Sequence, residues 1–438
     1  MSGIFGIISE ENCIDDAYWG TLYLQHRAQD YCGIAWKNGN DKLKNSTHKG
    51  LVEQNYKDKL GLIKTNLAIG CVSGSREPVS ELSNTGGMML CYDGNFANYS
   101  EIKDNLLKNG SSFSGYHNPE EIGEGVLISK IIARQSNFEK GIESLINHMQ
   151  GDFSIITLTL DGIYAARGWG RKPLILGKKE GSYAVSSESI SFINQGFNIV
   201  RDVEPGEVVL LNSDGINSIK KFDLSPIKYG TFEWIYTANP ASVIDGICVE
   251  LVRNYIGNSL AKKLTNLEVD VISPIPDSGR CHAFGVSDIL SKKIGVTQRE
   301  VFKKFSWLGR SFTPSELKEQ KIKADKKLIP VEALIRDKNI LLVDDSIVKG
   351  NQTRIQTKRL KELGAKKVYA AIACPPLISS CDYGKSIKKA EDCIAKRMSI
   401  DEIRETRGLD GLFYASIEDL EKAIGKPREQ LCLECWGM

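Results

Sequence analysis

The chain has 438 residues, 41% of them hydrophobic and 26% charged, a composition typical of globular proteins with two or three domains. Its 57 basic and 55 acidic residues leave a net charge of +2, which gives no electrostatic basis for binding nucleic acid or an anionic membrane. The N-terminal segment lacks the features of a signal peptide, and no stretch reaches the ~18 apolar residues of a membrane-spanning helix. We therefore expect a cytoplasmic protein whose 11 cysteines are reduced thiols or metal ligands.

The first half of the sequence alternates short apolar segments with glycine-rich turns. This pattern predicts strands at Ile4–Ile8, Cys32–Trp36, Leu67–Val72, Met88–Tyr92, Phe153–Leu158, Ile163–Ala166 and Tyr183–Ser186. Helical periodicity falls at Ala17–Gln25 and Gly123–Arg134. Hairpin-like strands follow around Glu204–Ile219, and Lys220–Gly230 has the composition of a linker. The first half is therefore expected to be a mixed α+β domain.

From Val243 onward, helical and strand-like segments alternate. The predicted order is helix, strand, helix, strand, helix, strand, at Val243–Lys263, Val269–Ile272, Cys281–Lys293, Asn339–Val343, Thr353–Leu363 and Lys367–Ala373. Apolar strands that alternate with helices of this length indicate a parallel α/β sheet. We expect one domain over residues 1–225 and a second over 226–438, the latter with a cysteine-containing C-terminal tail.

Two adjacent carboxylates, Asp344 and Asp345, follow the apolar strand Asn339–Val343 and precede a loop and a helix. Ligands of open parallel sheets bind beyond the carboxyl ends of the strands, and the N-terminus of a helix favours a phosphate. Gly350 would let the backbone approach a phosphate oxygen closely. The acids would then face ribose hydroxyls or Mg²⁺. The simpler alternative is that Asp345 or Ser346 only caps the helix.

A second loop, Pro274-Ile-Pro-Asp-Ser-Gly-Arg280, follows the strand predicted at Val269–Ile272. Ser278 can donate a hydroxyl, Gly279 permits an unusual backbone conformation, and Arg280 supplies a fixed positive charge. Alone, this loop is an ordinary turn. Together with the acid pair, it forms a plausible clamp for pyrophosphate and suggests a site for phosphoribosyl pyrophosphate (PRPP).

With these loops, the chain resembles the glutamine PRPP amidotransferase (amidophosphoribosyltransferase) family, whose acid-acid loop is that of type I phosphoribosyltransferases. The matching stretches are Gly3-Ile-Phe-Gly-Ile7, Leu24-Gln-His-Arg27, Gly94-Asn95, Arg201-Asp-Val-Glu-Pro-Gly-Glu207, Ser242-Val-Ile-Asp-Gly246, Pro276-Asp-Ser-Gly279, Gly309-Arg310 and Val343-Asp-Asp-Ser-Ile-Val348. The resemblance implies an α+β N-terminal-nucleophile glutaminase domain with αββα layers, followed by an α/β type I phosphoribosyltransferase domain with a parallel sheet.

The resemblance also implies roles for individual residues. Ammonia released in the first domain would attack C1 of PRPP in the second. Asp344 and Asp345 would bind the ribose hydroxyls and, with Ser278, Mg²⁺. The 5′-phosphate would be bound by Ser346, Lys349, Gly350 and Thr353. The pyrophosphate would be bound by Asp277, Ser278, Gly279 and Arg280. The mobile loop over the site would include Lys304 and Arg310. Purine nucleotides would be inhibitors, and the protein would be an oligomer.

The glutaminase positions depart from the family pattern. The family has cysteine after Met1, whose thiol attacks glutamine and whose α-amine is the base; this chain has Ser2. The arginine that binds the substrate carboxylate is replaced by Ser73, and the oxyanion-stabilising asparagine beside Gly94 by Asp93. The acidic residue that receives the substrate amine aligns loosely with Glu124. Together these changes predict a retained fold with a degenerate nucleophile position and lost glutamine hydrolysis.

The PRPP positions depart less. Asn351-Gln352-Thr353 stands where the family has Thr-Thr-Ser, and the lid motif becomes Lys304-Phe-Ser-Trp307 and loses an arginine. Amides can still donate hydrogen bonds to a phosphate, although their reach differs. These residues favour PRPP binding more strongly than efficient transfer.

Three cysteines, Cys381, Cys432 and Cys435, match three of the four cluster ligands in the iron–sulfur subgroup of the family. The fourth position is Gly230. The sequence leaves open a three-cysteine [4Fe–4S] cluster, a [3Fe–4S] cluster, substitution by Cys374 or Cys248, or free thiols. Cys13, Cys32, Cys71 and Cys91 are expected to pack as small apolar residues.

Three functional hypotheses follow. The first is an amidophosphoribosyltransferase of purine synthesis that uses Mg²⁺ and PRPP and takes ammonia rather than glutamine. The second is a catalytically impaired regulatory or structural subunit that assembles with an active paralogue. The third, an unrelated type I phosphoribosyltransferase acting on a base, is disfavoured by the matches in the first half.

Overall fold

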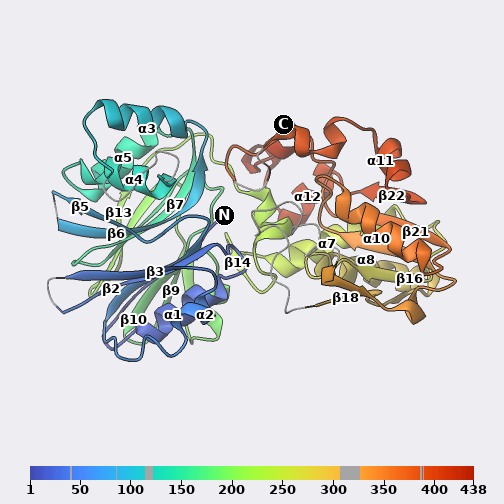
Figure 1. The fold of residues 1–438 in the computed structure, drawn as a ribbon, viewed down its shortest axis with the longest axis horizontal. Helices are drawn as coiled ribbons and strands as arrows, with labels where there is room; N and C mark the ends of the chain where they lie inside the picture. Colours follow the sequence, from blue (N-terminus) through green and yellow to red (C-terminus); the bar gives the residue numbers. More distant parts are fainter. Residues whose placement is uncertain (40–41, 85, 114–121, 306–325, 385–386, 388) are drawn as a thin grey trace. The chain divides into compact units, whose positions relative to one another are not determined.

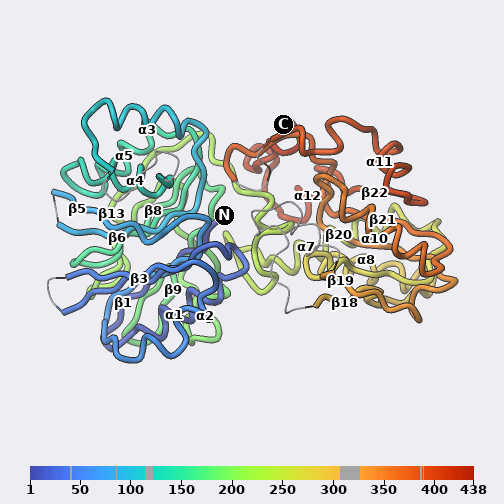
Figure 2. The backbone as a smooth tube through the Cα atoms, in the orientation of Figure 1, coloured from blue at the N-terminus to red at the C-terminus, as the bar shows by residue number. Residues whose placement is uncertain are grey.

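The computed structural model describes residues 1–39, 42–84, 86–113, 122–305, 326–384, 387 and 389–438. The chain forms two compact units. Unit 1 contains residues 1–230, the segment 241–246 and a few residues from Asp382; unit 2 contains residues 231–240 and most of the chain from Ile247 onward. In Figure 2 the backbone of unit 1 runs mostly from blue to green, and most of unit 2 from yellow-green to red.

Unit 1 is built on two antiparallel sheets (Figure 1). The seven-stranded sheet has the order β11-β9-β10-β1-β4-β2-β3, with β1 Gly3–Ser9, β2 Tyr31–Lys37, β3 Leu43–Lys49, β4 Leu67–Ser73, β9 Ile175–Lys179, β10 Ser182–Ser186 and β11 Asn198–Asp202. The six-stranded sheet has the order β13-β12-β8-β7-β6-β5, with β5 Val79–Ser83, β6 Gly86–Phe96, β7 Gly151–Leu158, β8 Ile163–Arg167, β12 Glu207–Asn212 and β13 Gly215–Lys221.

Helices cover the outer faces of both sheets. The first sheet carries α1 (Ile14–Tyr23), α2 (Val52–Tyr56) and α6 (Ile190–Ile193); the second carries α3 (Tyr99–Lys108), α4 (Glu124–Ala133) and α5 (Phe138–His148). Three apolar cores result: one between the sheets and one beneath each helical layer. This confirms the predicted αββα fold.

Unit 2 contains a five-stranded sheet in which every neighbouring pair of strands is parallel. The order is β17-β16-β20-β21-β22, with β16 Val271–Pro274, β17 Thr297–Gln298, β20 Asn339–Asp344, β21 Lys367–Ile372 and β22 Gly411–Tyr414. The parallel α/β expectation is therefore confirmed. The central strand β20 is buried from Ile340 to Val343, which explains its uninterrupted apolar sequence.

The helices of unit 2 are α7 Val249–Lys262, α8 Arg280–Ile294, α10 Asn351–Glu362, α11 Ile400–Thr406 and α12 Ile417–Ile424. A separate two-stranded ribbon joins β18 (Phe302–Lys304) to β19 (Leu328–Pro330). Glu233–Thr237 forms a π-helical turn. Within the described ranges, no helix combines the length and apolarity needed to cross a membrane.

Three of the predicted element starts were wrong. The helix expected from Val243 begins only at Val249, because Asp245 and Gly246 adopt positive φ angles of 48° and 73°, which a helix does not allow. Short strands β14 (Val243–Ile244) and β15 (Ile247–Cys248) flank that turn. The strand expected at Val269–Ile272 begins two residues later, at Val271. The start of the predicted linker was also wrong, because Lys220 and Lys221 belong to β13.

Candidate functional site

The acid pair lies at the carboxyl end of the central parallel strand. Asp344 is the last residue of β20, and Asp345, 5% exposed, follows it. The backbone N–H of Asp345 donates to the Asp344 carboxylate at 3.0 Å, and the Ser346 hydroxyl donates to Asp345. Burial and the Asp345 charge raise the pKa of Asp344 well above its usual value. The free site therefore holds negative charge that a cation or a pair of ligand hydroxyls would stabilise.

The second predicted loop begins beside the same strand end. Pro274 of β16 pairs with Val343 of β20, and the backbone N–H of Ile275 donates to the Val343 carbonyl at 2.8 Å. The peptide bond between Pro276 and Asp277 is cis. Because adjacent parallel strands end at the same sheet edge, the topology brings the two predicted loops together.

The unusual backbone conformation expected at Gly279 was wrong, whereas its role in binding pyrophosphate stays a prediction. Its φ of −75° is ordinary, so the loop does not need an unusual conformation there. Instead, an added Cβ would lie 2.3 Å from the Val343 carbonyl oxygen. Glycine is required because the loop packs directly against the end of β20.

Ion pairs link this loop to the segment Glu300–Lys304. Asp277 pairs with Arg280 at 2.6 Å and also with Lys304, while Arg280 pairs with Glu300 at 2.6 Å. The cations predicted to contact pyrophosphate are thus already held by carboxylates. Ser278 lies between them, partly buried. Arg310, predicted on the loop over the site, lies outside the described residues.

The loop between β20 and α10 has the shape of a phosphate cradle. Gly350 is the N-cap of α10 with a φ of 68°, a left-handed conformation that favours glycine. Asn351, Gln352 and Thr353 form the first turn, where free backbone N–H groups and the helix dipole favour an anion. The helix has no side-chain cap, so the alternative role of Asp345 or Ser346 as its cap was wrong. Lys349 pairs with Asp392 at 2.9 Å.

In unit 1, the predicted nucleophile position is buried within an ion-pair network. The backbone nitrogen of Ser2, itself 6% exposed, donates to Oδ1 of Asp93 at 2.7 Å. Arg27 donates to Oδ2 of Asp93 at 2.9 Å and to the Ser2 carbonyl at 2.7 Å. Although burial alone would raise it, Lys172, Arg27 and the N-terminal amino group hold the pKa of Asp93 at about 2. Asp93 is therefore a carboxylate near neutral pH.

A second buried carboxylate, Glu188, completes this network and carried no recognisable motif in the sequence. Its carboxylate accepts a hydrogen bond from Arg27 at 2.7 Å and another from Ser242 at 2.8 Å. Its Oε1 also lies 2.8 Å from Nε2 of His26. Burial opposes ionisation, but His26 and Arg27 hold the pKa of Glu188 at about 2. His26 thus belongs to a network that fixes the N-terminal strand.

Two further positions predicted for the glutaminase site, Ser73 and Gly94, are also buried in unit 1. Ser73 is fully buried, and its hydroxyl donates to the Ser75 carbonyl. Glu77, also missed by the sequence, accepts the Ser75 hydroxyl and the Tyr92 backbone N–H, both at 2.9 Å. Gly94 follows Asp93 in β6, where a Cβ would lie 2.2 Å from the Asp152 carbonyl oxygen.

The three C-terminal cysteines lie close together in unit 2. The Cys381 and Cys435 side chains are hydrogen-bonded, and the nearby Cys432 charge contributes to raising the pKa of Cys435. Cys432 also donates to Glu434. Among the described residues, however, no group of three or more His, Cys, Asp or Glu side chains is arranged to hold a metal ion.

A fourth cluster ligand does not fit at residue 230. A Cβ there would lie 2.4 Å from the Arg171 carbonyl oxygen. Of the suggested substitutes, Cys374 is buried beside the acid pair, whose charges help to raise the pKa of its thiol, and Cys248 precedes α7. The residues therefore do not fit a cluster held by four thiolates. As expected, Cys13, Cys32, Cys71 and Cys91 are buried in apolar cores.

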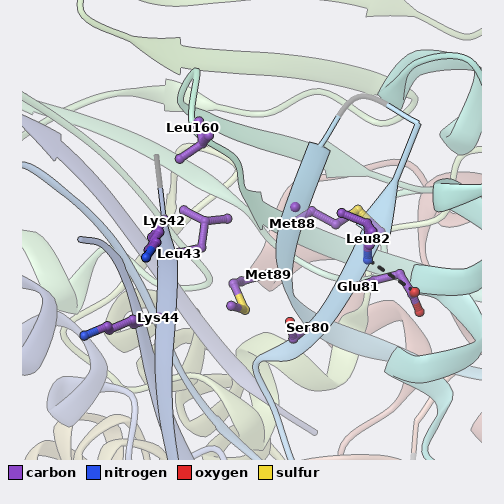
Figure 3. Close-up of a pocket in the computed structure, with 10 residues that line it drawn as sticks. Lys42, Leu43, Lys44, Ser80, Glu81, Leu82, Met88, Met89 and Leu160 are labelled. Carbon is purple, nitrogen blue, oxygen red and sulfur yellow. Dashed lines mark hydrogen bonds between the residues drawn. The ribbon is translucent and has the colours of Figure 1, made fainter. Parts of the chain in front are cut away.

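One hollow of about 520 Å³ lies in unit 1, away from every predicted site residue (Figure 3). It lies between β3 and β5, the edge strands of the two sheets, with Met88, Met89 and Leu160 along its walls and Lys42 and Lys44 on the β3 side. Its residues match none of the functional motifs.

Known proteins resemble this chain along nearly its whole length. The family profile described as a glutamine amidotransferase domain matches residues 64–194. The chain is 32% identical over 463 residues to the amidophosphoribosyltransferase of Methanocaldococcus jannaschii, covering 99% of this chain and 96% of that protein. It is 31% identical over 455 residues to the amidophosphoribosyltransferase of Bacillus subtilis, covering 99% and 92%.

Two solved structures share the fold along nearly the whole chain. The glutamine PRPP amidotransferase from B. subtilis, complexed with ADP and GMP, matches with a TM-score of 0.87 and 30% identity, covering 99% of this chain and 96% of that one. A structure described as the allosteric regulatory enzyme of purine biosynthesis also matches with a TM-score of 0.87 and 30% identity, covering 99% and 94%.

Proposed function

The chain belongs to the amidophosphoribosyltransferase family of purine biosynthesis, and from this premise we propose that it forms 5-phosphoribosylamine from PRPP and free ammonia, having lost glutamine hydrolysis. The observation that carries the proposal is a contrast between the two units. Unit 2 keeps an acid pair and a phosphate cradle at one sheet edge, whereas unit 1 has a carboxylate at the position of an oxyanion-stabilising amide.

We assign PRPP to the sheet edge in three parts. The Asp344 and Asp345 carboxylates accept hydrogen bonds from the ribose hydroxyls. The turn around Gly350, with Ser346, Lys349 and Thr353, receives the 5′-phosphate at the start of α10. The loop Asp277–Arg280, with Lys304 and, by resemblance, Arg310, receives the pyrophosphate.

The donor set also suits Mg²⁺. This ion is usually bound by one or two carboxylates together with oxygens of a phosphorylated substrate. Asp344 and Asp345 supply the carboxylates, Ser278 supplies a hydroxyl, and PRPP would supply the remaining oxygens. When bound, Mg²⁺ would neutralise charge that develops on the departing pyrophosphate.

The reaction itself needs orientation and charge stabilisation more than a covalent intermediate. The nitrogen lone pair of ammonia forms a bond to C1, the bond from C1 to the pyrophosphate oxygen breaks with its electron pair, and the new amine releases a proton to solvent. Arg280 and Lys304 must first exchange their contacts with Asp277 for contacts with pyrophosphate, after which they stabilise its negative charge.

Loss of glutaminase activity follows from the groups around Ser2. Even with Met1 removed, the new α-amine would lie against the Asp93 carboxylate, which favours its protonated form. An ammonium group cannot act as the general base that an N-terminal nucleophile requires. Asp93 would also repel the oxyanion, and Ser73 cannot pair with the glutamine carboxylate.

The alternative is a catalytically impaired subunit that assembles with an active paralogue. The Asn351-Gln352 pair and the carboxylate-bound Arg280 and Lys304 favour it, because both features weaken contacts with PRPP. In either role we propose an oligomer, homomeric or mixed, that purine nucleotides inhibit. The B. subtilis relative was solved with ADP and GMP.

The test measures pyrophosphate release by the purified chain with PRPP, Mg²⁺ and ammonium chloride. We expect steady release that falls at least about 100-fold in Asp345→Asn, through loss of a charged contact to the substrate. Asp288→Asn, an exposed position on α8, is the matched control and should retain the wild-type rate. PRPP binding without release by the wild-type chain would overturn the enzymatic proposal in favour of the subunit.

A further inference from the structure

A basic cavity of about 530 Å³ lies between α10 and the end of α11 in unit 2. In Figure 1 these helices are orange and red. Arg354, Lys358 and Lys361 line it from α10, and Thr406 and Arg407 from the end of α11. Along α10 the lining runs from Arg354 to Glu362, so it begins one residue beyond Thr353 and includes none of the residues assigned to the 5′-phosphate.

The positive charges at this cavity differ in how they are compensated. Lys358 pairs with Glu362 at 3.6 Å, and Lys361 pairs with Asp410 at 3.1 Å. By contrast, no described carboxylate forms an ion pair with Arg354, Arg407 or the neighbouring Arg397. The cavity therefore presents an excess of guanidinium charge that the protein itself does not neutralise.

The guanidinium groups also lie near enough to disfavour one another. Burial and the charges of Arg354 and Arg397 lower the pKa of Arg407. Nε of Arg407 is buried and has no acceptor within the described structure. It packs against Gly350, where an added Cβ would lie only 2.7 Å away. A group of like charges costs free energy, which an anion bound in the cavity would recover.

The size of the cavity and the charges of its lining residues limit the class of ligand that it can bind. A volume of about 530 Å³ falls within the usual range of small-molecule sites. Glu362 and Glu405 also line the cavity and would repel a chain of carboxylates such as an acidic peptide. A compact dianion placed between the arginines avoids that repulsion, and guanidinium groups match phosphate oxygens in pairs.

We propose that the cavity between α10 and α11 binds a phosphate group, either free or as the ester of a small metabolite. Arg354 and Arg407 line the cavity and, with the neighbouring Arg397, provide the positive charge. The residues of this site are not among those assigned to PRPP. The site can be present whether the chain is an active transferase or a subunit.

Equilibrium dialysis with radiolabelled inorganic phosphate tests the proposal. The double variant Arg397→Leu/Arg407→Leu should bind one equivalent of phosphate fewer per chain than the wild type. The matched control Arg299→Leu/Arg336→Leu removes two exposed arginines of the same unit and should retain the wild-type stoichiometry. Circular dichroism spectra must show that both variants are folded, and Arg354→Leu, with at least about 10-fold weaker binding, provides an independent second variant.

Competition then identifies the source of the phosphate. Displacement of the label by AMP or glucose 6-phosphate at concentrations below those of unlabelled phosphate assigns the site to an ester, whereas equal displacement by sulfate and phosphate assigns it to the free anion. Equal stoichiometry in the wild type and the double variant, or no binding at all, would overturn the proposal. The ammonia-dependent release of pyrophosphate is scored separately, so failure of one proposal does not conceal failure of the other.

Discussion

The backbone nitrogen of Ser2 donates to Oδ1 of Asp93 across 2.7 Å, and Arg27 holds the other oxygen of the same carboxylate. The resemblance to the family predicts a free amine and a neutral amide at these two positions. With Met1 attached, this nitrogen is a peptide N–H, and we propose that after removal of Met1 the carboxylate would favour the protonated form of the new amine. Replacing the nucleophile alone would therefore leave the base and the oxyanion site unsuitable.

Restoring glutaminase chemistry should accordingly require more than a thiol. We predict no measurable glutamate release from glutamine by Ser2→Cys. The triple variant Ser2→Cys/Ser73→Arg/Asp93→Asn should exceed Ser2→Cys/Ser73→Arg by about 100-fold, because the amide replaces a repelling carboxylate at the oxyanion position. Hydrolysis by Ser2→Cys alone at the rate of the triple variant would contradict this account of Asp93.

The same carboxylate should stabilise unit 1. Asp93→Asn removes one carboxylate partner of the buried Arg27 and leaves its pair with Glu188, and we expect a loss of roughly 3 kcal/mol in the free energy of unfolding. Urea unfolding followed by tryptophan fluorescence measures the change. Asp214→Asn, in the exposed β12–β13 turn, is the control and should change stability little. An unchanged Asp93→Asn transition would show that the pair contributes nothing.

The stability of unit 1 should fall with acidity in a defined range. The pKa of Asp93 falls from 3.8 to about 2 on folding, and that of Glu188 from 4.5 to about 2. A depressed pKa contributes stability above the unfolded value and loses it as the pH falls through the folded value. Unfolding midpoints should therefore decline from about pH 4.5 toward pH 2, and Asp93→Asn should show a shallower decline. Parallel declines would contradict the assignment.

Asp344 should show the opposite behaviour, because its pKa is raised. The ionised form is disfavoured in the folded chain, so stability is lost as the pH rises above the unfolded pKa. Asp344→Asn should therefore raise the thermal midpoint of ligand-free protein by a few degrees near neutral pH, with no gain at pH 3. It should also weaken PRPP binding by about 10- to 100-fold in calorimetry. A variant that is less stable and binds PRPP normally would exclude a ligand-binding role for this acid.

The C-terminal cysteines lead to a prediction about iron. Because residue 230 cannot accept a side chain without moving Arg171, anaerobic reconstitution should not yield a stable cluster with four irons and four sulfides per chain. Iron and acid-labile sulfide analysis measures this. A stoichiometric four-iron cluster in the wild type that disappears in Cys435→Ser, but not in Cys248→Ser, would show that three cysteines and another ligand suffice.

Much of the site could be predicted because its residues follow local rules. An apolar strand followed by two acids and a glycine placed Asp344 and Asp345 at the end of β20 and Gly350 at the start of α10, and the parallel sheet brought the second loop beside the acids. The reason for Gly279 could not be predicted in this way, because it depends on the Val343 carbonyl of a neighbouring strand.

Other features depended on long-range contacts that leave no local pattern. Glu188 and Arg27 are 161 residues apart in the sequence, and Asp93 and Ser2 are 91 residues apart. Neither contact could therefore be inferred from residue spacing. The helix predicted from Val243 was wrong because an apolar run concealed the turn at Asp245 and Gly246. Arg310 lies outside the described residues, and its role stays a prediction.

The most direct test of the central claim supplies both nitrogen sources at once. The chain is incubated with PRPP, Mg²⁺, unlabelled ammonium and glutamine labelled with ¹⁵N in its amide, and the nitrogen of the phosphoribosylamine is identified by mass spectrometry after chemical trapping. We predict a product that contains only the unlabelled nitrogen of ammonia. A product enriched in ¹⁵N, without contaminating glutaminase activity, would contradict the account, because it would show that the Ser2 site still hydrolyses glutamine.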